Sequence, residues 1–198
     1  MSAPPFLMLS DLTRQPDWRA AVTAQPRSVG LVLRDYDHHA RAEMAAEMAR
    51  LCHGQGRYFS IAGDARLAAK HGAAFHCPSH MLARLPLWRG PRRISTHVKS
   101  RTHTAAVHNH GELIAAKRAG FTTVLISPIF ATPSHADASP LGLMRAVPLL
   151  RAAREMGLRA YALGGMDMQS WHRLGGLAVA DGFAAIRSFA PKRVLAAP

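Results

Sequence analysis

Short runs of apolar residues, many of them β-branched, alternate with amphipathic segments along the whole chain. A short, continuously apolar run is typical of a parallel strand that is buried on both faces. Such runs predict strands at 6–9, 29–34, 58–61, 73–77, 104–108, 122–127, 159–163 and 182–186. Several of them lead directly into small, polar or glycine residues, as strands do when they deliver a loop to a binding face.

Segments with helical periodicity lie between these strands. They predict helices at 17–24, 39–53, 64–71, 111–119, 141–156 and 168–174. Gly72 and Gly120 follow two of them as stop signals. Repeated β/α alternation without internal repeats predicts an α/β fold, a single-domain (β/α)8 TIM barrel covering 1–198. An open doubly wound sheet is the structural alternative, but it normally carries a glycine-rich first turn, which is absent here.

Composition agrees with one soluble domain. The chain has 198 residues, 48% of them hydrophobic, and a mean hydropathy of −0.03, which is typical of a globular protein. No apolar run approaches the ~20 residues of a membrane helix, and the first residues do not resemble a secretory signal. Cys52 and Cys77 are too few for a disulfide framework. We therefore expect a cytoplasmic protein with no membrane partner.

The charge balance is unusually basic. Lys and Arg number 25 against 12 Asp and Glu, giving a net charge of +13 and an isoelectric point near 11.3. Nucleic-acid binding is one interpretation, and a site for phosphorylated small molecules on an arginine-rich surface is the other. The basic residues are scattered and lack interleaved aromatic side chains for base stacking. We expect a phosphorylated small-molecule ligand and not nucleic acid; the role of the basic 89–103 segment stays open.

In a barrel of this kind the residues at the carboxyl ends of the strands form the site. Gly164 and Gly165 follow the seventh predicted strand and let backbone amides approach an anion with no side chain in the way. Ile186 and Arg187 at the eighth strand add amides and a cation. Phosphate sites concentrate at these two strands, so we expect phosphate there, although glycines also end strands for conformational reasons alone.

Three motifs carry a family resemblance. They are SPIFATPSH at 127–135, GGM at 164–166 and ADGFAAIRS at 180–188. They resemble the GPxFxTxTK-like loop, the GGI and the AxGVAxxS of the thiamine phosphate synthase and thiazole tautomerase superfamily. Upstream, LVLR at 31–34 is similar to the family's VQLR, and AAVH at 105–108 with Glu112 is similar to SVHSxEE. The motifs keep their order over almost the whole chain.

The resemblance implies a (β/α)8 barrel that acts in thiamine biosynthesis. In the synthase reaction it implies, thiazole phosphate is joined to a pyrimidine diphosphate. It implies that the phosphate is held by Thr132, Ser134, Gly164, Gly165, Ile186 and Arg187. The expected catalytic residues are His108, His135 and Arg34, because of their places at the barrel mouth; the family has a lysine where this chain has His135.

The chain departs from the family at the magnesium site. The family's synthases bind magnesium pyrophosphate through an aspartate in IND and another in HLGQxD. This chain has Ala62-Gly63 at the first place and Cys77-Pro78-Ser79-His80-Met81 at the second. Mg²⁺ prefers oxygen ligands, so it remains a possible cofactor whose family ligands are missing. Asp64, one residue displaced, and His80 are the possible substitutes.

The alternatives follow from these losses. A tautomerase moves a proton without a metal, and a neutral imidazole at His108 or His135 suits that chemistry. Equally, His108 could simply bond a backbone carbonyl, and Arg34 could pair internally with Asp35 or Glu43. A degenerate paralogue that binds a phosphorylated ligand without turnover is a third reading. The twelve histidines lack the spacing of a zinc site, so no metal ligands are assigned, and a homodimer is possible.

Overall fold

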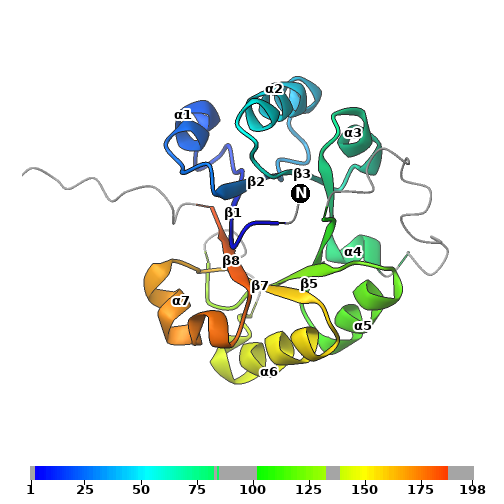
Figure 1. Cartoon of the computed structure of the whole chain (residues 1–198), viewed down its shortest axis with the longest axis vertical. Helices are drawn as coiled ribbons and strands as arrows, with labels where there is room; N and C mark the ends of the chain where they lie inside the picture. Colours follow the sequence, from blue (N-terminus) through cyan, green and yellow to red (C-terminus); the bar gives the residue numbers. More distant parts are fainter. Residues whose placement is uncertain (1–2, 83, 85–101, 133–138, 187–198) are drawn as a thin grey trace, which may run out of the picture.

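Eight parallel strands close into a barrel in the order β1 to β8. The computed structural model in Figure 1 describes residues 3–82, 84, 102–132 and 139–186. The strands are β1 (Phe6–Leu9), β2 (Val29–Leu33), β3 (Phe59–Ala62), β4 (Ala74–Cys77), β5 (Thr104–Val107), β6 (Thr123–Ile126), β7 (Arg159–Leu163) and β8 (Gly182–Ala185). β1 pairs with β8 as well as with β2, so the predicted TIM barrel is confirmed.

Helices form an outer ring around the barrel (Figure 1). They are α1 (Trp18–Thr23), α2 (Arg41–Gly54), α3 (Ala65–Lys70), α4 (Ser79–Leu82), α5 (His110–Arg118), α6 (Gly142–Glu155) and α7 (Met168–Leu174), followed by the 3₁₀ turn η5 (Gly176–Ala178). The sequence pattern predicted all of them except α4 and η5, which are too short to show a period. None of the helices in the described segments is long and apolar enough to span a membrane.

Local signals account for several helix starts. The side chains of Asp17, Asp64 and Asn109 accept a hydrogen bond from the first turn of α1, α3 and α5, which satisfies one of the amides left unpaired at a helix start. Asp167 and Ser170 form a reciprocal capping box on α7. α2 lacks a side-chain cap at Ala40, and it begins two residues later than expected.

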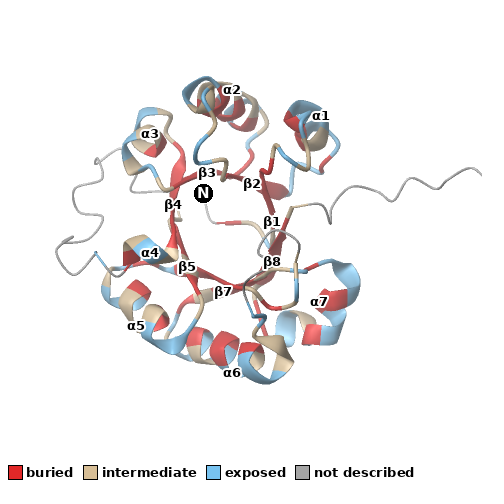
Figure 2. Ribbon diagram, turned by 180° about the vertical axis from the view of Figure 1, so that it is seen from behind, coloured by how far each residue is buried: buried red, intermediate tan, exposed pale blue. Residues whose placement is uncertain are grey.

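The apolar residues divide into two packed layers. Alternate strand residues, among them Leu7, Val32 and Leu125, fill the barrel interior, while their neighbours pack outward against the helices. This alternation follows from the two-residue period of a strand. Figure 2 shows the buried residues along the strands and on the inner faces of the helices.

The N-terminal segment covers the amino ends of the strands. The Arg159 side chain and the Tyr161 hydroxyl donate to the carbonyl of Ala3, at 2.7 and 3.1 Å. A Cβ at Gly182 would lie 2.0 Å from the Pro5 carbonyl oxygen, so only glycine permits this approach. With this end filled, the opposite mouth is left for a site.

Candidate functional site

The carboxyl ends of the strands bring the predicted residues to one mouth of the barrel. Because all strands are parallel, Arg34 after β2, His108 after β5, Gly164 after β7 and Ile186 after β8 lie on the same rim. Thr132 lies in the loop after β6 and is half-buried. Ser134, His135 and Arg187 lie outside the described residues, so their assigned roles stay predictions.

The two glycines after β7 support the loop that follows β6. Both have positive φ, 94° at Gly164 and 63° at Gly165. A Cβ at Gly164 would lie 2.8 Å from Pro128 Cα, and one at Gly165 would lie 2.7 Å from Phe130 Cβ. The Phe130 amide donates to the Gly164 carbonyl at 3.0 Å. The glycines therefore have a conformational and packing role in addition to any role toward an anion.

The amides of these glycines have no hydrogen-bond acceptor among the residues that the structure describes. Within the described residues, neither the Gly164 nor the Gly165 amide donates a hydrogen bond to the protein. Adjacent amides without partners are the feature by which a backbone turn binds phosphate. The predicted phosphate cradle is therefore compatible with the structure on this side of the mouth.

A charged triad lies at the ends of β1 and β2. The Asp11 carboxylate is 5% exposed and accepts from Arg14 at 2.6 Å and from Arg34 at 3.2 Å. The two arginine side chains are about a quarter exposed, at 26% and 23%. The alternative to anion binding named for Arg34 is an internal ion pair with Asp35 or Glu43; the structure shows an internal ion pair, but with Asp11. Two cations share one carboxylate, so the triad carries an excess positive charge.

The triad is connected to the end of β8. The Gln15 side-chain amide donates to the Ile186 carbonyl at 2.9 Å, while its oxygen is buried with no hydrogen bond. Asp35 accepts from the Ser10 hydroxyl at 2.5 Å and from the Leu12 amide at 2.8 Å. These contacts hold the loop after β1 against both neighbours, next to the predicted phosphate cradle.

His108 is held in one orientation at the end of β5. Its Nδ1 lies 2.6 Å from the Ser127 carbonyl oxygen, and its Nε2 lies 3.0 Å from the Ser79 hydroxyl. Because a carbonyl can only accept, Nδ1 carries the proton in the neutral ring and Nε2 is the basic nitrogen. The bond to a backbone carbonyl, one of the two expectations for His108, is confirmed. It does not exclude proton transfer, because Nε2 remains basic.

Two other mouth residues have structural roles. His76 is buried, bonds Thr104 Oγ1 at 2.8 Å, and has its pKa lowered to about 4 because burial disfavours the charged ring. It is therefore neutral at physiological pH. Asn109 caps α5, and its side-chain amide contacts Glu112 at 3.0 Å. The Asn109 side chain and the Nδ1 of His76 are therefore engaged within the protein.

The residues at the ends of β3 and β4 do not fit a magnesium ion. Asp64 uses its carboxylate to accept from the Leu67 amide at 2.8 Å, which caps α3. Cys77 is buried, and burial raises its thiol pKa to about 12. No group of three acidic, histidine or cysteine side chains able to hold a metal occurs in the described part of the chain. In this structure the Asp64 carboxylate therefore serves as a helix cap, and its role as a substitute metal ligand stays a prediction.

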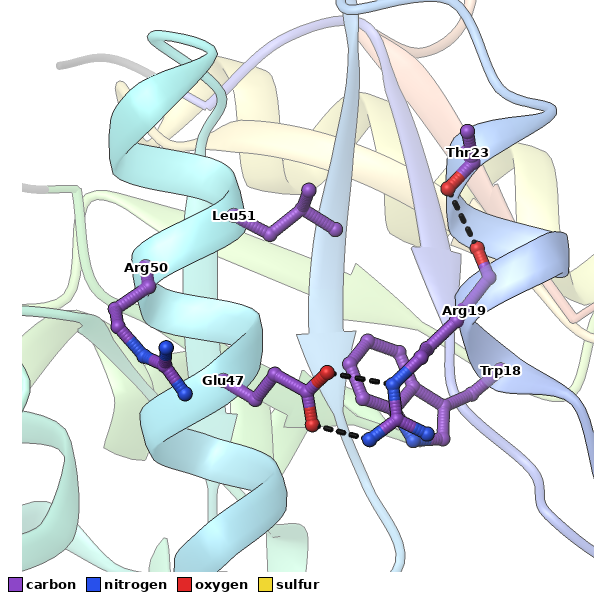
Figure 3. A pocket seen from close by; sticks show the side chains of 6 residues that line it. All are labelled: Trp18, Arg19, Thr23, Glu47, Arg50 and Leu51. Carbon is purple, nitrogen blue, oxygen red and sulfur yellow. Dashed lines mark hydrogen bonds and ion pairs between the residues drawn. The ribbon is translucent and has the colours of Figure 1, made fainter.

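A hollow of about 300 Å³ lies elsewhere, between α1 and α2 on the outer ring. Figure 3 shows its six lining side chains, with the Arg19–Glu47 ion pair crossing between the helices. Trp18 and Leu51 supply its apolar wall. Hydrogen bonding to Glu47 raises the pKa of Arg19. This hollow is lined by residues of the two helices and by none of the predicted site residues, and its Arg19 and Glu47 side chains pair with each other.

Comparison with known families decides the relationship. A family model described as thiamine monophosphate synthase matches residues 17–189. The chain belongs to the thiamine monophosphate synthase family. The match covers every strand from β2 to β8 and all the mouth residues described above except those of the loop after β1. Comparison with curated proteins gave no match.

Solved structures agree with the family fold. The thiamine phosphate pyrophosphorylase from Pyrococcus furiosus is similar with a TM-score of 0.69 and 14% identity, over 96% of this chain and 89% of that one. A deoxyribose phosphate aldolase from Aeropyrum pernix gives 0.63 and 12%, over 95% and 88%. A nitroalkane oxidase from Streptomyces ansochromogenes gives 0.58 and 16%, over 96% and 68%. At such identities the likeness shows the TIM barrel alone.

The motifs missed three side chains that the structure places at the mouth. Asp11 and Arg14 lie after β1, and Ser79 begins α4. Asp11 and Arg14 could have been found by applying to β1 the rule applied to the later strands, namely that residues beyond the carboxyl end face the site. Nothing in the sequence pairs Ser79 with His108, because 29 residues separate them.

Proposed function

We propose that this protein binds thiazole phosphate and thiamine phosphate at the carboxyl mouth of the barrel and joins the thiazole to a pyrimidine diphosphate. The observation that carries the proposal is the pair of amides at Gly164 and Gly165, which donate to no group in the described part of the chain and lie on the same rim as the Asp11–Arg14–Arg34 triad. Family membership supplies the reaction type. The cytoplasmic location and the phosphorylated ligand are part of this proposal.

The proposed roles follow the charges around the mouth. The glycine amides, with Thr132 and the Ile186 turn, hold the thiazole phosphate. Arg34 faces the diphosphate. When the carbon–oxygen bond to the pyrimidine methylene breaks, its electron pair leaves with pyrophosphate, and the thiazole nitrogen then forms the new carbon–nitrogen bond. A guanidinium stabilises the charge that develops on the departing oxygen. Ser134, His135 and Arg187 keep their predicted roles in this scheme.

The test is formation of thiamine phosphate from thiazole phosphate and the pyrimidine diphosphate. Arg34→Gln is expected to lower the rate at saturating substrate, because it removes charge that acts on the leaving group. Arg118→Gln, on the outer helix α5, is the matched control and should leave the rate unchanged. Absence of product under all conditions, together with thermal stabilisation by thiamine phosphate, would support a non-catalytic binder instead.

A second function is favoured by the geometry of His108. Its Nε2 is basic in the neutral tautomer and lies beside the Ser79 hydroxyl, which suits a base that moves a proton on a thiazole ring. Deuterium exchange at the thiazole carboxylate carbon would reveal this tautomerase activity. Exchange that His108→Asn abolishes, in a protein that forms no thiamine phosphate, would replace the synthase proposal.

A further inference from the structure

On the rim between β2 and β4, the residue at the end of β3 is a glycine packed against Tyr36. Gly63 follows β3 with φ 74°. A Cβ built there would lie 2.9 Å from Tyr36 Cε1 and 3.8 Å from Pro78 Cγ. An aspartate tolerates this backbone conformation better than most residues, but its Cβ would require the Tyr36 ring to move. The place of the family aspartate is therefore taken by a glycine packed against Tyr36.

The neighbouring oxygen and sulfur groups are also engaged or neutral. Asp35 accepts from Ser10 and Leu12, and Asp64 caps α3. Burial raises the pKa of the Tyr36 phenol and of the Cys77 thiol. A hard divalent cation needs several charged or carbonyl oxygens facing one point, and the described residues here do not offer them.

Arg41 places a fixed cation on this part of the rim. From the first turn of α2 its guanidinium donates to the Asp35 carbonyl and, at 2.5 Å, to the Ala62 carbonyl. It also lies over the Tyr36 ring, with 5.5 Å from its Cζ to the ring centroid. It therefore bridges the ends of β2 and β3. Asp64, Asp35 and Asp37 lie close enough to act on its charge, but none of them forms an ion pair with it in the described parts of the chain.

The geometry of Arg41 leaves it able to bind an anion. Two carbonyls take two of its five N–H donors, and the planar fork suits the oxygens of a phosphoryl group. The side chain is half-buried, and this burial lowers its pKa. A partly desolvated cation with unused donors gains more from an anion than one in open water does.

We infer that this rim binds a diphosphate group without a divalent cation, with the Arg41 guanidinium supplying positive charge where relatives use a metal. The inference rests on the proposed function, since it assigns the diphosphate half of the same mouth. It adds a specific residue, Arg41, and a property, metal independence, that set this chain apart from the magnesium-dependent synthases it resembles.

The first experiment measures binding of inorganic pyrophosphate by isothermal titration calorimetry, once in EDTA and once in millimolar Mg²⁺. The expected result is binding in EDTA with a Kd within about threefold of that in Mg²⁺, and no heat when Mg²⁺ is titrated alone. Pyrophosphate binding that requires Mg²⁺, or no binding in either buffer, would overturn the inference.

The second experiment repeats the titration in EDTA with variants of the guanidinium. Arg41→Gln should weaken pyrophosphate binding roughly tenfold or more, because it removes charge-assisted hydrogen bonds, and Arg41→Lys should be intermediate. Arg50→Gln is the control, an exposed arginine on the same helix α2. Wild-type affinity in Arg41→Gln would overturn the role of Arg41. If that variant does not fold, Arg41→Lys decides, since loss of the fork alone should weaken binding.

These outcomes separate the two claims. Pyrophosphate binding in EDTA that depends on Arg41, in a protein that neither forms nor binds thiamine phosphate, would leave the inference standing and refute the proposed function. Formation of thiamine phosphate only in the presence of Mg²⁺ would support the synthase reaction and refute metal independence.

Discussion

Replacing Asp11 by asparagine tests the charged triad, because stability and anion affinity should change in opposite directions. The carboxylate is 5% exposed and lies 2.6 Å from Arg14 and 3.2 Å from Arg34. Without it, two arginine side chains that are about three-quarters buried lose the carboxylate that they share. Asparagine keeps the size of the side chain and the bond from the Arg14 backbone amide, which is 3.2 Å long.

The loss of stability expected for Asp11→Asn lies between two known limits. Breaking a fully buried pair costs about 3–5 kcal/mol, and an exposed pair contributes about 0.2–1 kcal/mol. Since the arginines are about a quarter exposed, we expect a loss of about 2–3 kcal/mol in the free energy of unfolding. For a domain of this size that corresponds to a fall of roughly 4–12 °C in Tm.

The assay is thermal unfolding with and without inorganic phosphate. In Asp11→Asn an anion can take the place of the carboxylate, so phosphate should raise Tm by more than it does in the wild type. Glu47→Gln, at the exposed Arg19–Glu47 pair, is the control and should lower Tm far less. The argument would be refuted if Asp11→Asn lowered Tm no more than the control, or if phosphate stabilised both proteins equally.

Three further outcomes are expected. The pKa of His76 is about 4 in the folded protein against about 6.5 unfolded. The unfolded state therefore binds the extra proton, and stability should fall by about 3 kcal/mol between pH 6.5 and pH 4. Urea unfolding across this range should show a smaller fall in His76→Gln, whereas the exposed His172→Gln should keep the full fall. Gly165→Ala should lower the free energy of unfolding by about 2 kcal/mol or more, because the residue has a positive φ and the new Cβ would collide with Phe130. Calorimetry of the same variant should show loss of phosphate binding. Gly54→Ala is the control: a Cβ there would have no atom within 4 Å, so stability should stay the same or rise. Burial raises the thiol pKa of Cys52 and of Cys77 to about 12. Ellman's reagent should therefore react with these thiols only when the protein unfolds. Rapid labelling of the native protein would contradict their burial.

The agreement between sequence and structure is uneven for physical reasons. Strand and helix periods are local properties, so the β/α alternation and the barrel could be read from the chain. The rule that strand ends form the mouth then placed Arg34, His108 and Gly164 on one rim. The short helix α4 was missed because four residues cannot show a helical period.

By itself the sequence determined the fold, the family and the loss of the acidic residues at the ends of β3 and β4, because these depend on local pattern and residue identity. Which side chains contact each other depends instead on how the barrel closes. Only the tertiary structure showed that Arg34 pairs with Asp11 rather than Asp35, that Ser79 bonds His108, and that Arg41 reaches the end of β3. Such contacts join residues 20 or more positions apart, and no local signal encodes which side chains meet once the strands close.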